Sequence, residues 1–511
     1  MAEQTVGVSP LAVFVTLTLF TVIIGYVAYL SRKKLKATSE DYLIAGRTIG
    51  IIATFFGIYT TQISVWTFLG LASLGYSMGI GAIILAAGAC YVFNAYIGAR
   101  ICSLGHKLRW MTQADYFADR FESKVWMRIL VPIIGIISLV TGHIMVQFTG
   151  IAQVFTALTG GMVPYIYGLV YAGALMILFL YLGGLRGTAW TDIIFGSFML
   201  GLATALVLLF YSVLSSQYGL TVPQAYIAVS QNVPKVLTLP GIVPYFTYAV
   251  LISWLFWGFG FFFGQPHMFM WNVSAKSPRV LKLFPILMIP AMLLTQWYSI
   301  ATFGVLSRVL YPDKPPVPAD QIIPYFVATF VKNEWLAPVL LLGVLSAALS
   351  TAAGASICLG GMVVKNIIRD VIKPDISEKT SFRLSRVFAV VFVILGGVLA
   401  FVPPQYLALV LVVSIGWVAP LVPPIFLGLY WKRANKCGAY ASIIAGELLA
   451  LYLMVFPKEW GGGYGSGAAW LGFFAVFWVI VIGTVVCILV SYLTSPPSKE
   501  TIQKFFEEEK R

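Results

Sequence analysis

The chain has 511 residues, of which 59% are apolar and only 10% charged, and its mean hydropathy is +0.90. A soluble chain would carry roughly 25% charged residues, and a disordered chain would be far less apolar. The composition excludes both classes and indicates a polytopic membrane protein, to which an aromatic content of 15% is suited. The net charge of +14 does not require nucleic acid as a partner, because Lys and Arg residues in a membrane protein indicate on which side of the membrane each loop lies.

Thirteen stretches are long and apolar enough to cross a membrane as helices, which takes about 20 residues each. In chain order they are 11–30, 49–76, 80–102, 129–158, 164–182, 189–213, 244–270, 283–310, 336–364, 385–402, 405–430, 438–456 and 468–494. We therefore expect an all-α polytopic membrane protein. An odd number of spans places the two termini on opposite sides of the membrane.

Basic residues are distributed unevenly over the segments between these spans. If the N-terminus is outside, 28 of the 33 Lys and Arg residues lie inside, and the other five are Lys235, Arg308, Lys314, Lys332 and Lys458. Lys and Arg favour the cytoplasmic side of a membrane. We expect a protein of the plasma membrane with its N-terminus outside and its C-terminus inside. Anionic inner-leaflet lipids are the expected partners, and no nucleic acid is expected.

Two of the spans are interrupted by small and polar residues. The first interruption is 59–67 (YTTQISVWT), and the second is 257–267 (WGFGFFFGQPH). Glycine and β-branched residues weaken a helix, and proline removes a backbone donor. Breaks at this depth are tolerated where the freed carbonyls line a cavity, and they lie five spans apart, as in a five-plus-five inverted repeat with discontinuous helices. Tight helix packing at glycine is the alternative, but it explains Thr-Thr-Gln-x-Ser poorly.

A third cluster of small and hydroxylated residues lies at 345–354 (LSAALSTAAG). Ser350 and Thr351 follow the carbonyl of Ala347 by one turn, so one helix could supply three oxygen ligands. Neutral hydroxyl and carbonyl oxygens suit a monovalent hard cation such as Na⁺. Faces rich in Ser, Ala and Gly also serve ordinary helix packing, and the cluster alone does not decide between the two.

Ionisable side chains are scarce within the spans. Of the 19 carboxylates, only Asp192 and Glu447 lie inside them, and acids at this depth are costly. For Asp192 a functional role and a helix N-cap are both open. We expect Glu447 to be structural. His143, the one histidine in the middle of a span, is expected to be a hydrogen-bonded packing residue.

Motifs for nucleotide or metal chemistry are absent from the sequence. There is no P-loop, no zinc-protease helix and no nucleophile elbow, and the five cysteines have no zinc-ligand spacing. Any pumping must therefore draw on an ion gradient. A channel would need charged rings or a repeated filter motif, and no span shows either.

Four segments resemble signatures of the sodium/solute symporter family. They occur in order and are 41–47 (DYLIAGR), 183–187 (GGLRG) with 190–192 (WTD), 264–267 (GQPH) and 428–439 (GLYWKRANKCGA). The resemblance implies a LeuT-type inverted repeat with an extra leading helix. It divides the chain into a leading helix with a basic loop (1–47), a transport core (48–436, repeats about 48–213 and 244–430), two peripheral helices (437–494) and a cytoplasmic tail (495–511).

The same resemblance implies a sodium site for the coupling ion. Its ligands would be the main-chain oxygens of Thr60 and Ile63, the carbonyl of Ala347 and the hydroxyls of Ser350 and Thr351. Asp192, in the matching Trp-Thr-Asp segment, would lie on the inner exit path of the ion.

The solute would bind beside the two breaks. The implied residues are Gln62, Ser64 and Trp66 at the first break, Trp257 and Phe261 at the second, and Gln147 from the span 129–158. Several amino-acid-transporting members have an acid at the position of Gln62, so H⁺ coupling stays open beside Na⁺. One extra residue between Trp257 and Gly264 leaves it open which aromatic ring faces the solute.

We therefore expect a symporter that couples Na⁺ to the uptake of a small organic solute by alternating access, and not an enzyme. The segment 64–70 (SVWTFLG) and the segment around Gln147 resemble the monocarboxylate branch most. Proton coupling, a proline-like amino acid and pantothenate are the alternatives, and a channel or a transporter-like sensor is the alternative from another class. The oligomeric state is not predicted.

Overall fold

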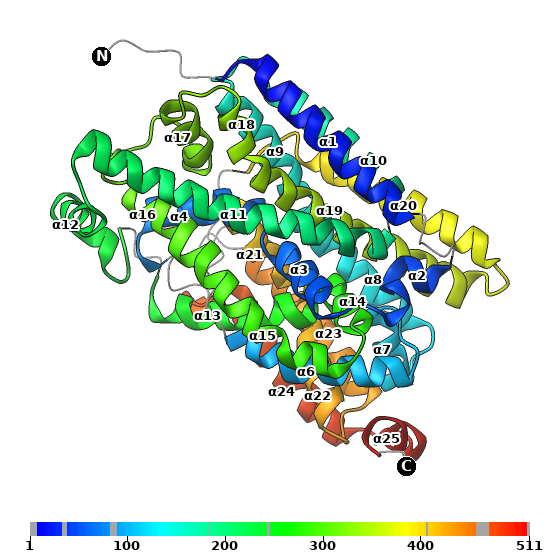
Figure 1. The fold of residues 1–511 in the computed structure, drawn as a ribbon. Coiled ribbons are helices and arrows are strands. Elements are labelled where there is room, and N and C mark those ends of the chain that lie inside the picture. The colour runs from blue at the N-terminus through cyan, green and yellow to red at the C-terminus, as the bar shows by residue number, and fades with distance from the viewer. Residues whose placement is uncertain are drawn as a thin grey trace.

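The structure is a computed structural model, and it describes residues 8–32, 38–81, 89–182, 184–242, 246–404, 407–455 and 470–507. Within these ranges every regular element is a helix, and one isolated β-bridge joins Ile49 to Ala275. The prediction of an all-α protein is confirmed (Figure 1).

The first half of the chain begins with a long helix and contains the first broken span. Its elements are α1 (Pro10–Arg32), α2 (Ser39–Ile44), η1 (Ala45–Arg47), α3 (Ile51–Gln62), η2 (Trp66–Leu71), α4 (Ala72–Met78), α6 (Ala89–Lys107), α7 (Gln113–Arg120), α8 (Trp126–Ser138), η3 (Leu139–Ile144), α9 (Met145–Leu158), α10 (Tyr165–Leu182), α11 (Gly184–Tyr218), α12 (Val222–Asn232) and η4 (Pro234–Leu237).

The second half resembles the first, because it also contains a broken span, with which it begins. Its elements are α13 (Tyr248–Phe259), η5 (Gly260–Gly264), α14 (Pro266–Ser274), α15 (Pro278–Met292), η6 (Leu293–Ala301), α16 (Thr302–Leu306), η7 (Ala319–Gln321), α17 (Ile322–Phe330), α18 (Leu336–Leu340), α19 (Leu342–Met362), η8 (Val363–Ile372), α20 (Glu378–Leu399), α21 (Leu407–Val418), η9 (Ala419–Leu421), α22 (Val422–Tyr430), α23 (Lys436–Val455), η10 (Trp470–Gly472), α24 (Ala475–Leu493) and α25 (Lys499–Phe506).

The described residues contain nine helical stretches that are long and apolar enough to span a membrane, or eleven when each of two bent pairs counts as one span. The bent pairs are Ile51–Gln62 with Trp66–Met78, at 55°, and Tyr248–Gly264 with Pro266–Ser274, at 59°. Both predicted breaks are therefore present. The expected count of thirteen is not confirmed: the stretch 80–102 lies partly outside the described residues, and 164–182 forms the shorter apolar helix Tyr165–Leu180.

Five of the elements are π-helical turns, namely η2, η3, η5, η6 and η8. A π turn holds one residue more than an α turn and is frequent at functional sites. The π turn η5 contains Phe261 and lies in the segment 257–264, where the family resemblance implies one residue more than the usual spacing. The wide turn can absorb that residue without displacing the helix on either side.

The centre of the bundle is α19, whose side chains are all buried. Its Gly, Ala and Ser residues allow α3, α9, α11 and α20 to pack closely around it, as small residues do in membrane helices. The leading helix α1 packs on α10 and α11 at the edge, and α23 pairs with α24 elsewhere on the surface (Figure 1).

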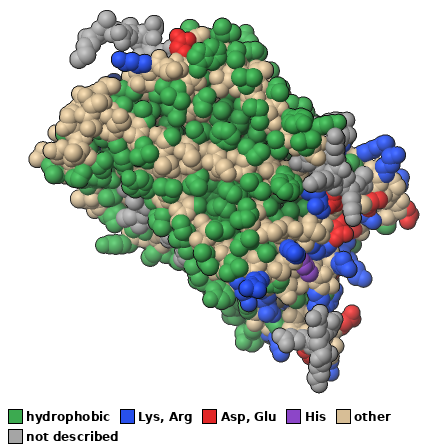
Figure 2. Space-filling model, viewed as in Figure 1, with side chains coloured by type: hydrophobic (Ala, Val, Ile, Leu, Met, Phe, Trp, Pro, Cys, Tyr) green, Lys and Arg blue, Asp and Glu red, His purple; other side chains and the backbone are tan. Residues whose placement is uncertain are grey.

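The outer surface is apolar along most of the bundle. In Figure 2 hydrophobic side chains cover the broad face, while most charged side chains of this view gather at the end where α2, α7 and α25 lie. Large apolar residues such as Phe14, Tyr167 and Ile286 are more than 60% exposed. A surface of this kind fits lipid rather than water.

Candidate functional site

The first break separates α3 from the π turn η2. Ile63 has an extended backbone (φ −78°, ψ 105°), so the helical hydrogen-bond ladder stops there. Two side chains accept the freed amides: Ser64 Oγ accepts from Trp66 N at 3.1 Å, and Gln147 Oε1 accepts from Val65 N at 3.2 Å. The interruption is thus a supported structural feature at membrane depth.

The second break lies between η5 and α14. Gln265 is extended (ψ 122°), and Pro266 begins α14, where its missing N–H costs nothing. The freed carbonyls of Phe263 and Gly264 accept hydrogen bonds from Gln113 Nε2 at 2.8 and 3.0 Å. Gly264 is required by space, because a Cβ there would lie 2.7 Å from the carbonyl oxygen of Val418.

The breaks are held together on the side of α3 and α14. The ring of Trp271, on α14, packs against Gly57 of α3 so closely that a Cβ on Gly57 would lie 2.2 Å from it. Trp271 Nε1 also donates to Thr61 Oγ1 at 3.1 Å. The two half-helices therefore form one packed pair.

The hydroxyls implied for the sodium site meet in the structure. Ser350 Oγ donates to Asp192 Oδ1 at 2.6 Å and lies 2.8 Å from Thr60 Oγ1. Thr351 Oγ1 donates to the main-chain oxygen of Thr60 at 3.2 Å. All four residues are at most 1% exposed. The cluster, which we call the ion side, consists of neutral oxygens and one carboxylate.

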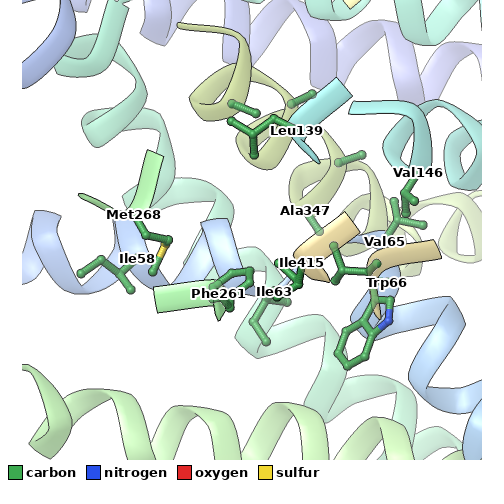
Figure 3. Packing of buried hydrophobic residues seen from close by; sticks show 14 of the residues in the cluster. Ile58, Ile63, Val65, Trp66, Leu139, Val146, Phe261, Met268, Ala347 and Ile415 are labelled. Atoms are coloured by element: carbon green, nitrogen blue, oxygen red, sulfur yellow. The ribbon is translucent and has the colours of Figure 1, made fainter. Parts of the chain in front are cut away.

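Ile63 and Ala347, the other two residues implied for the ion, are both fully buried. Figure 3 shows them in one view with Val65 and Trp66 of the first break and Phe261 of the second. The extended conformation of Ile63 takes its carbonyl out of the α3 helix, which leaves that oxygen available as a ligand.

Asp192 lies well inside α11, which begins at Gly184. The alternative that it caps the N-terminus of a helix is therefore wrong, because the helix begins eight residues before Asp192 and five residues before the start that the hydropathy indicated. Asp192 Oδ2 is buried and has no hydrogen-bond partner among the described residues.

Aromatic rings predicted for the solute form a ladder. Trp66 stacks on Trp257 with ring centroids 5.9 Å apart, and Trp257 stacks on Phe261 at 5.4 Å, each pair inclined by 20°. Trp254 packs against Trp66 and Trp257 at 6.0 and 5.1 Å. We call these rings, with Gln147 and Ser64 beside them, the solute side.

The two glutamines differ in their surroundings. Gln147 is buried, and its Nε2 donates to the carbonyl of His143 at 2.8 Å while its Oε1 holds the first break. Gln62 is half-buried, and its Nε2 donates to Tyr91 OH of α6 at 2.7 Å. Tyr91 packs edge-on against Phe262, so Gln62 joins the first break to the second through α6.

Two histidines next to the ladder were not predicted to belong to it. His143, in η3, is stacked on Phe261 at 6.0 Å, and His267, in α14, lies 5.1 Å from His143. Neither ring makes a side-chain hydrogen bond within the described residues, so the prediction of a hydrogen-bonded His143 is wrong. The motif GQPH contained His267, but only the fold shows that it faces His143.

Arginine side chains hold three of the segments that resemble the family signatures. Arg186 donates to Asp41 Oδ1 from Nη2 at 2.6 Å and from Nε at 3.0 Å, and to the Ala45 carbonyl at 2.8 Å. Gly183 of the same segment lies outside the described residues. The segment 428–439 is anchored by Arg120, which donates to the carbonyls of Gly428 and Trp431.

A second ionic cluster joins α7 to η8. Asp115 pairs with Lys365 and accepts from Asn366 Nδ2 at 3.0 Å and from the amides of Met111 and Thr112 at 2.8 and 3.0 Å. Burial would raise the pKa of Asp115, but the Lys365 charge and these hydrogen bonds outweigh burial and hold the pKa below its usual value.

An apolar helical bundle with two broken spans that meet at a buried site of neutral oxygens and stacked rings is the architecture of a membrane-embedded secondary transporter of the LeuT fold. The chain belongs to the sodium:solute symporter family, whose model matches residues 42–446. It is thus a sodium-coupled solute symporter of many spans and not an enzyme.

Similar proteins cover nearly the whole chain. The sodium/proline symporter of Escherichia coli (strain K12) is 24% identical over 497 residues, covering 95% of this chain and 93% of the relative. The sodium/pantothenate symporter of the same organism is 27% identical over 454 residues, covering 86% and 90%. The solved structure of a Na⁺-coupled sialic acid symporter matches with a TM-score of 0.73 at 18% identity, covering 96% and 99%.

Proposed function

We propose that this symporter carries a small monocarboxylate into the cell together with Na⁺. The supporting observation is the chemistry of the solute side, which offers buried N–H donors from Trp254 and Trp257 that have no partner among the described residues. The position where several amino-acid-transporting members have an acid holds the neutral Gln62. A solute with a carboxylate and no ammonium group therefore suits the site best.

The proposed sodium ligands are the main-chain oxygens of Thr60 and Ile63, the Ala347 carbonyl and the hydroxyls of Ser350 and Thr351. The contacts among Thr60, Ser350 and Thr351 support this set, since two hydroxyls and a carbonyl from two helices already converge. Hard monovalent cations favour such neutral oxygens. We place Asp192 on the inner exit path, because it touches Ser350 on the α11 side of the cluster.

The orientation follows from the basic residues. We propose an outside N-terminus and an inside C-terminus in the plasma membrane, with the ionic clusters of Asp41 and Asp115 at the inner end and anionic lipids beside them. The transport core then runs from 48 to 436 in two repeats, followed by the peripheral helices 437–494 and the inner tail 495–511.

A proline-like amino acid or pantothenate is the second candidate solute, because relatives that cover most of the chain are named for proline and pantothenate. Proline differs from a small monocarboxylate by its ammonium group, whose charge the neutral Gln62 cannot balance, although Gln62 Oε1 has no hydrogen-bond partner among the described residues and can accept from it. Pantothenate has one carboxylate and no amine, and differs from lactate or pyruvate by its greater length.

The test is uptake into proteoliposomes with an imposed Na⁺ or H⁺ gradient and labelled lactate, pyruvate, proline, pantothenate and glucose. We expect accumulation of lactate or pyruvate driven by Na⁺ and not by H⁺ alone. Accumulation of proline or pantothenate with no transport of either monocarboxylate would contradict the proposed solute. Uptake driven by H⁺ alone would contradict the proposed coupling.

A further inference from the structure

His143 and His267 form a buried pair that the sodium site and the ladder do not use. Their ring centroids lie 5.1 Å apart with the planes inclined by 69°, and each residue is 2% exposed. Nδ1 and Nε2 of both rings are buried without a hydrogen-bond partner in the described part of the chain. Four ring nitrogens are thus left unsatisfied at one point.

Such an arrangement is expensive for a purely structural pair. A neutral imidazole always has one N–H donor and one acceptor, and a buried polar group left unpaired destabilises the fold. Packing alone would favour phenylalanine or leucine at both positions. The pair therefore points to a ligand that accepts from the two ring N–H groups, while the two acceptor nitrogens are left for donors such as water or a hydroxyl of the ligand.

The position of the pair connects it to the solute side. Phe261 stacks on His143 at 6.0 Å and meets His267 edge-on at 6.3 Å, so the ladder Trp66, Trp257, Phe261 continues directly into the two imidazoles. The carbonyl of His143 is held by Gln147. The pair therefore adds ring nitrogens at the Phe261 end of the ladder, beyond the indole N–H groups of Trp254 and Trp257.

The backbone around His267 adds a second feature that favours an anion. His267 is the second residue of the nine-residue helix α14, directly after Pro266. The first amides of a helix have no intrahelical acceptor and create a positive end that binds anionic groups. The imidazole N–H donors and this helix N-terminus therefore both favour the binding of an anion.

A metal ion fits the pair poorly, because the described residues contain no group of three His, Cys, Asp or Glu side chains. A proton relay also lacks members, since neither ring hydrogen-bonds to a carboxylate or to any other side chain of a described residue. Hydrogen bonding to an anion needs no further protein group.

We propose that His143 and His267 donate ring N–H groups to the carboxylate of the solute, and so fix its polar end against the N-terminus of α14. This inference deepens the proposed function and rests on it for the presence of a carboxylate on the solute. Phe261, the ring of the ladder next to both histidines, would then contact the apolar part of the same molecule.

The test is Na⁺-driven uptake of lactate and pyruvate by proteoliposomes containing His143→Phe, His267→Phe or both. A hydrogen bond to a charged group is worth about 1.5–3 kcal/mol, so we expect each substitution to raise the solute KM roughly tenfold or more. The Na⁺ concentration for half-maximal uptake at saturating solute should not change. His106→Phe is the matched control, because His106 is the third histidine of the chain and bonds to the Val273 carbonyl at the end of α6.

Conservative variants keep the test decisive if a Phe variant fails to fold. Asn places a donor near the position of Nδ1 and Gln one near Nε2, so either the Asn or the Gln variant at each position should restore most of the affinity. Binding of pyruvate to the detergent-solubilised protein, followed by tryptophan fluorescence, gives the same comparison without transport.

The outcomes distinguish failure of the histidine–carboxylate contact from failure of the proposed monocarboxylate transport. Wild-type transport of monocarboxylates with an unchanged KM in both Phe variants would overturn the inference alone. A parallel loss of the Na⁺ response would also overturn it, by showing a structural role. If the wild type transports proline instead, the monocarboxylate proposal fails, and the inference stands only if the same variants raise the KM for proline.

Discussion

On the ion side of the site, the polar groups bond to one another. Ser350 and Thr351 reach Thr60 across the gap between α19 and α3, and Ser350 also reaches Asp192. On the solute side, by contrast, the ring nitrogens of Trp257, His143 and His267 make no hydrogen bonds to described residues. The residues of both sides are less than 10% exposed, so contact with solvent does not explain the difference.

The difference follows from the shapes of the side chains. A hydroxyl on a short stem can turn toward whichever oxygen is nearest, so the hydroxyls of the ion side find partners, although Asp192 Oδ2 has none among the described residues. Rigid rings packed face to face cannot turn without losing their stacking contacts. Selectivity for a small ion can therefore come from adaptable oxygens, whereas selectivity for a larger solute needs fixed donors that wait for its polar group.

The largest effect on this comparison is expected from a substitution that forces α3 and α14 apart. Helix α3 carries Thr60 of the ion side, and α14 carries His267 beside the solute side. Gly57→Ala places a Cβ 2.2 Å from the Trp271 ring, and overpacking of this kind costs about 1–3 kcal/mol. We expect loss of Na⁺-driven uptake, because α3 and α14 can no longer pack as one unit. Gly354→Ala is the control, since a Cβ there meets nothing within 4 Å. Uptake at the wild-type rate by Gly57→Ala would show that the contact is dispensable.

The ion side can be altered alone by Ser350→Ala combined with Thr351→Ala. Removal of two hydroxyl ligands should raise the Na⁺ concentration needed for half-maximal uptake by about tenfold, which corresponds to about 1.4 kcal/mol. The solute KM at saturating Na⁺ should stay near the wild-type value. Uptake measured over a Na⁺ titration gives both numbers, and an unchanged Na⁺ response would remove the two hydroxyls from the site. Ser356→Ala, five residues beyond Thr351 on α19, is the control.

A smaller effect is expected at Asp115, which belongs to neither side. Its pKa is held below the usual value, so its contribution to stability is complete above that usual value, near 3.8, and is lost as the pH falls through the lower pKa of the folded state. Asp115→Asn should lower the free energy of unfolding by on the order of 1 kcal/mol at neutral pH and less at pH 3. Thermal unfolding in detergent between pH 3 and 7 measures this.

The control for that experiment is Asp375→Asn, because Asp375 is exposed in the loop after η8. Equal unfolding temperatures for Asp115→Asn and the wild type across the whole pH range would show that the pair with Lys365 does not stabilise the fold. A change in solute KM would show that this cluster and the site are coupled.

Much of the fold could be predicted because hydropathy and helix-breaking residues act locally. The clusters around Thr60 and Gly264 marked both breaks, and the charge distribution marked one end of the molecule. The start of α11 could not be predicted from hydropathy. Residues such as Arg186 belong to the helix but are polar, since they pair with Asp41 of a distant segment.

The candidate site was less accessible to prediction, because its residues come from four or more helices. The ion side followed from the family resemblance and from the adjacency of Ser350 and Thr351. The pairing of His143 with His267 joins residues 124 positions apart, and nothing in either local sequence signals it. The π turns were equally invisible, because they depend on how tertiary contacts hold one extra residue.

These wide turns also affect how the bundle can change shape. A π turn that releases its extra residue rotates the helix beyond it by about 100° and shifts it by about 1.5 Å, while both helical segments stay hydrogen-bonded. The turns η3 and η5 carry His143 and Phe261, and η6 lies on the adjoining span. A register slip of one residue in η3 or η5 would therefore turn the ring of His143 or Phe261 away from its present position. Such a slip changes which side chains line the site while the helices on both sides of the turn stay intact.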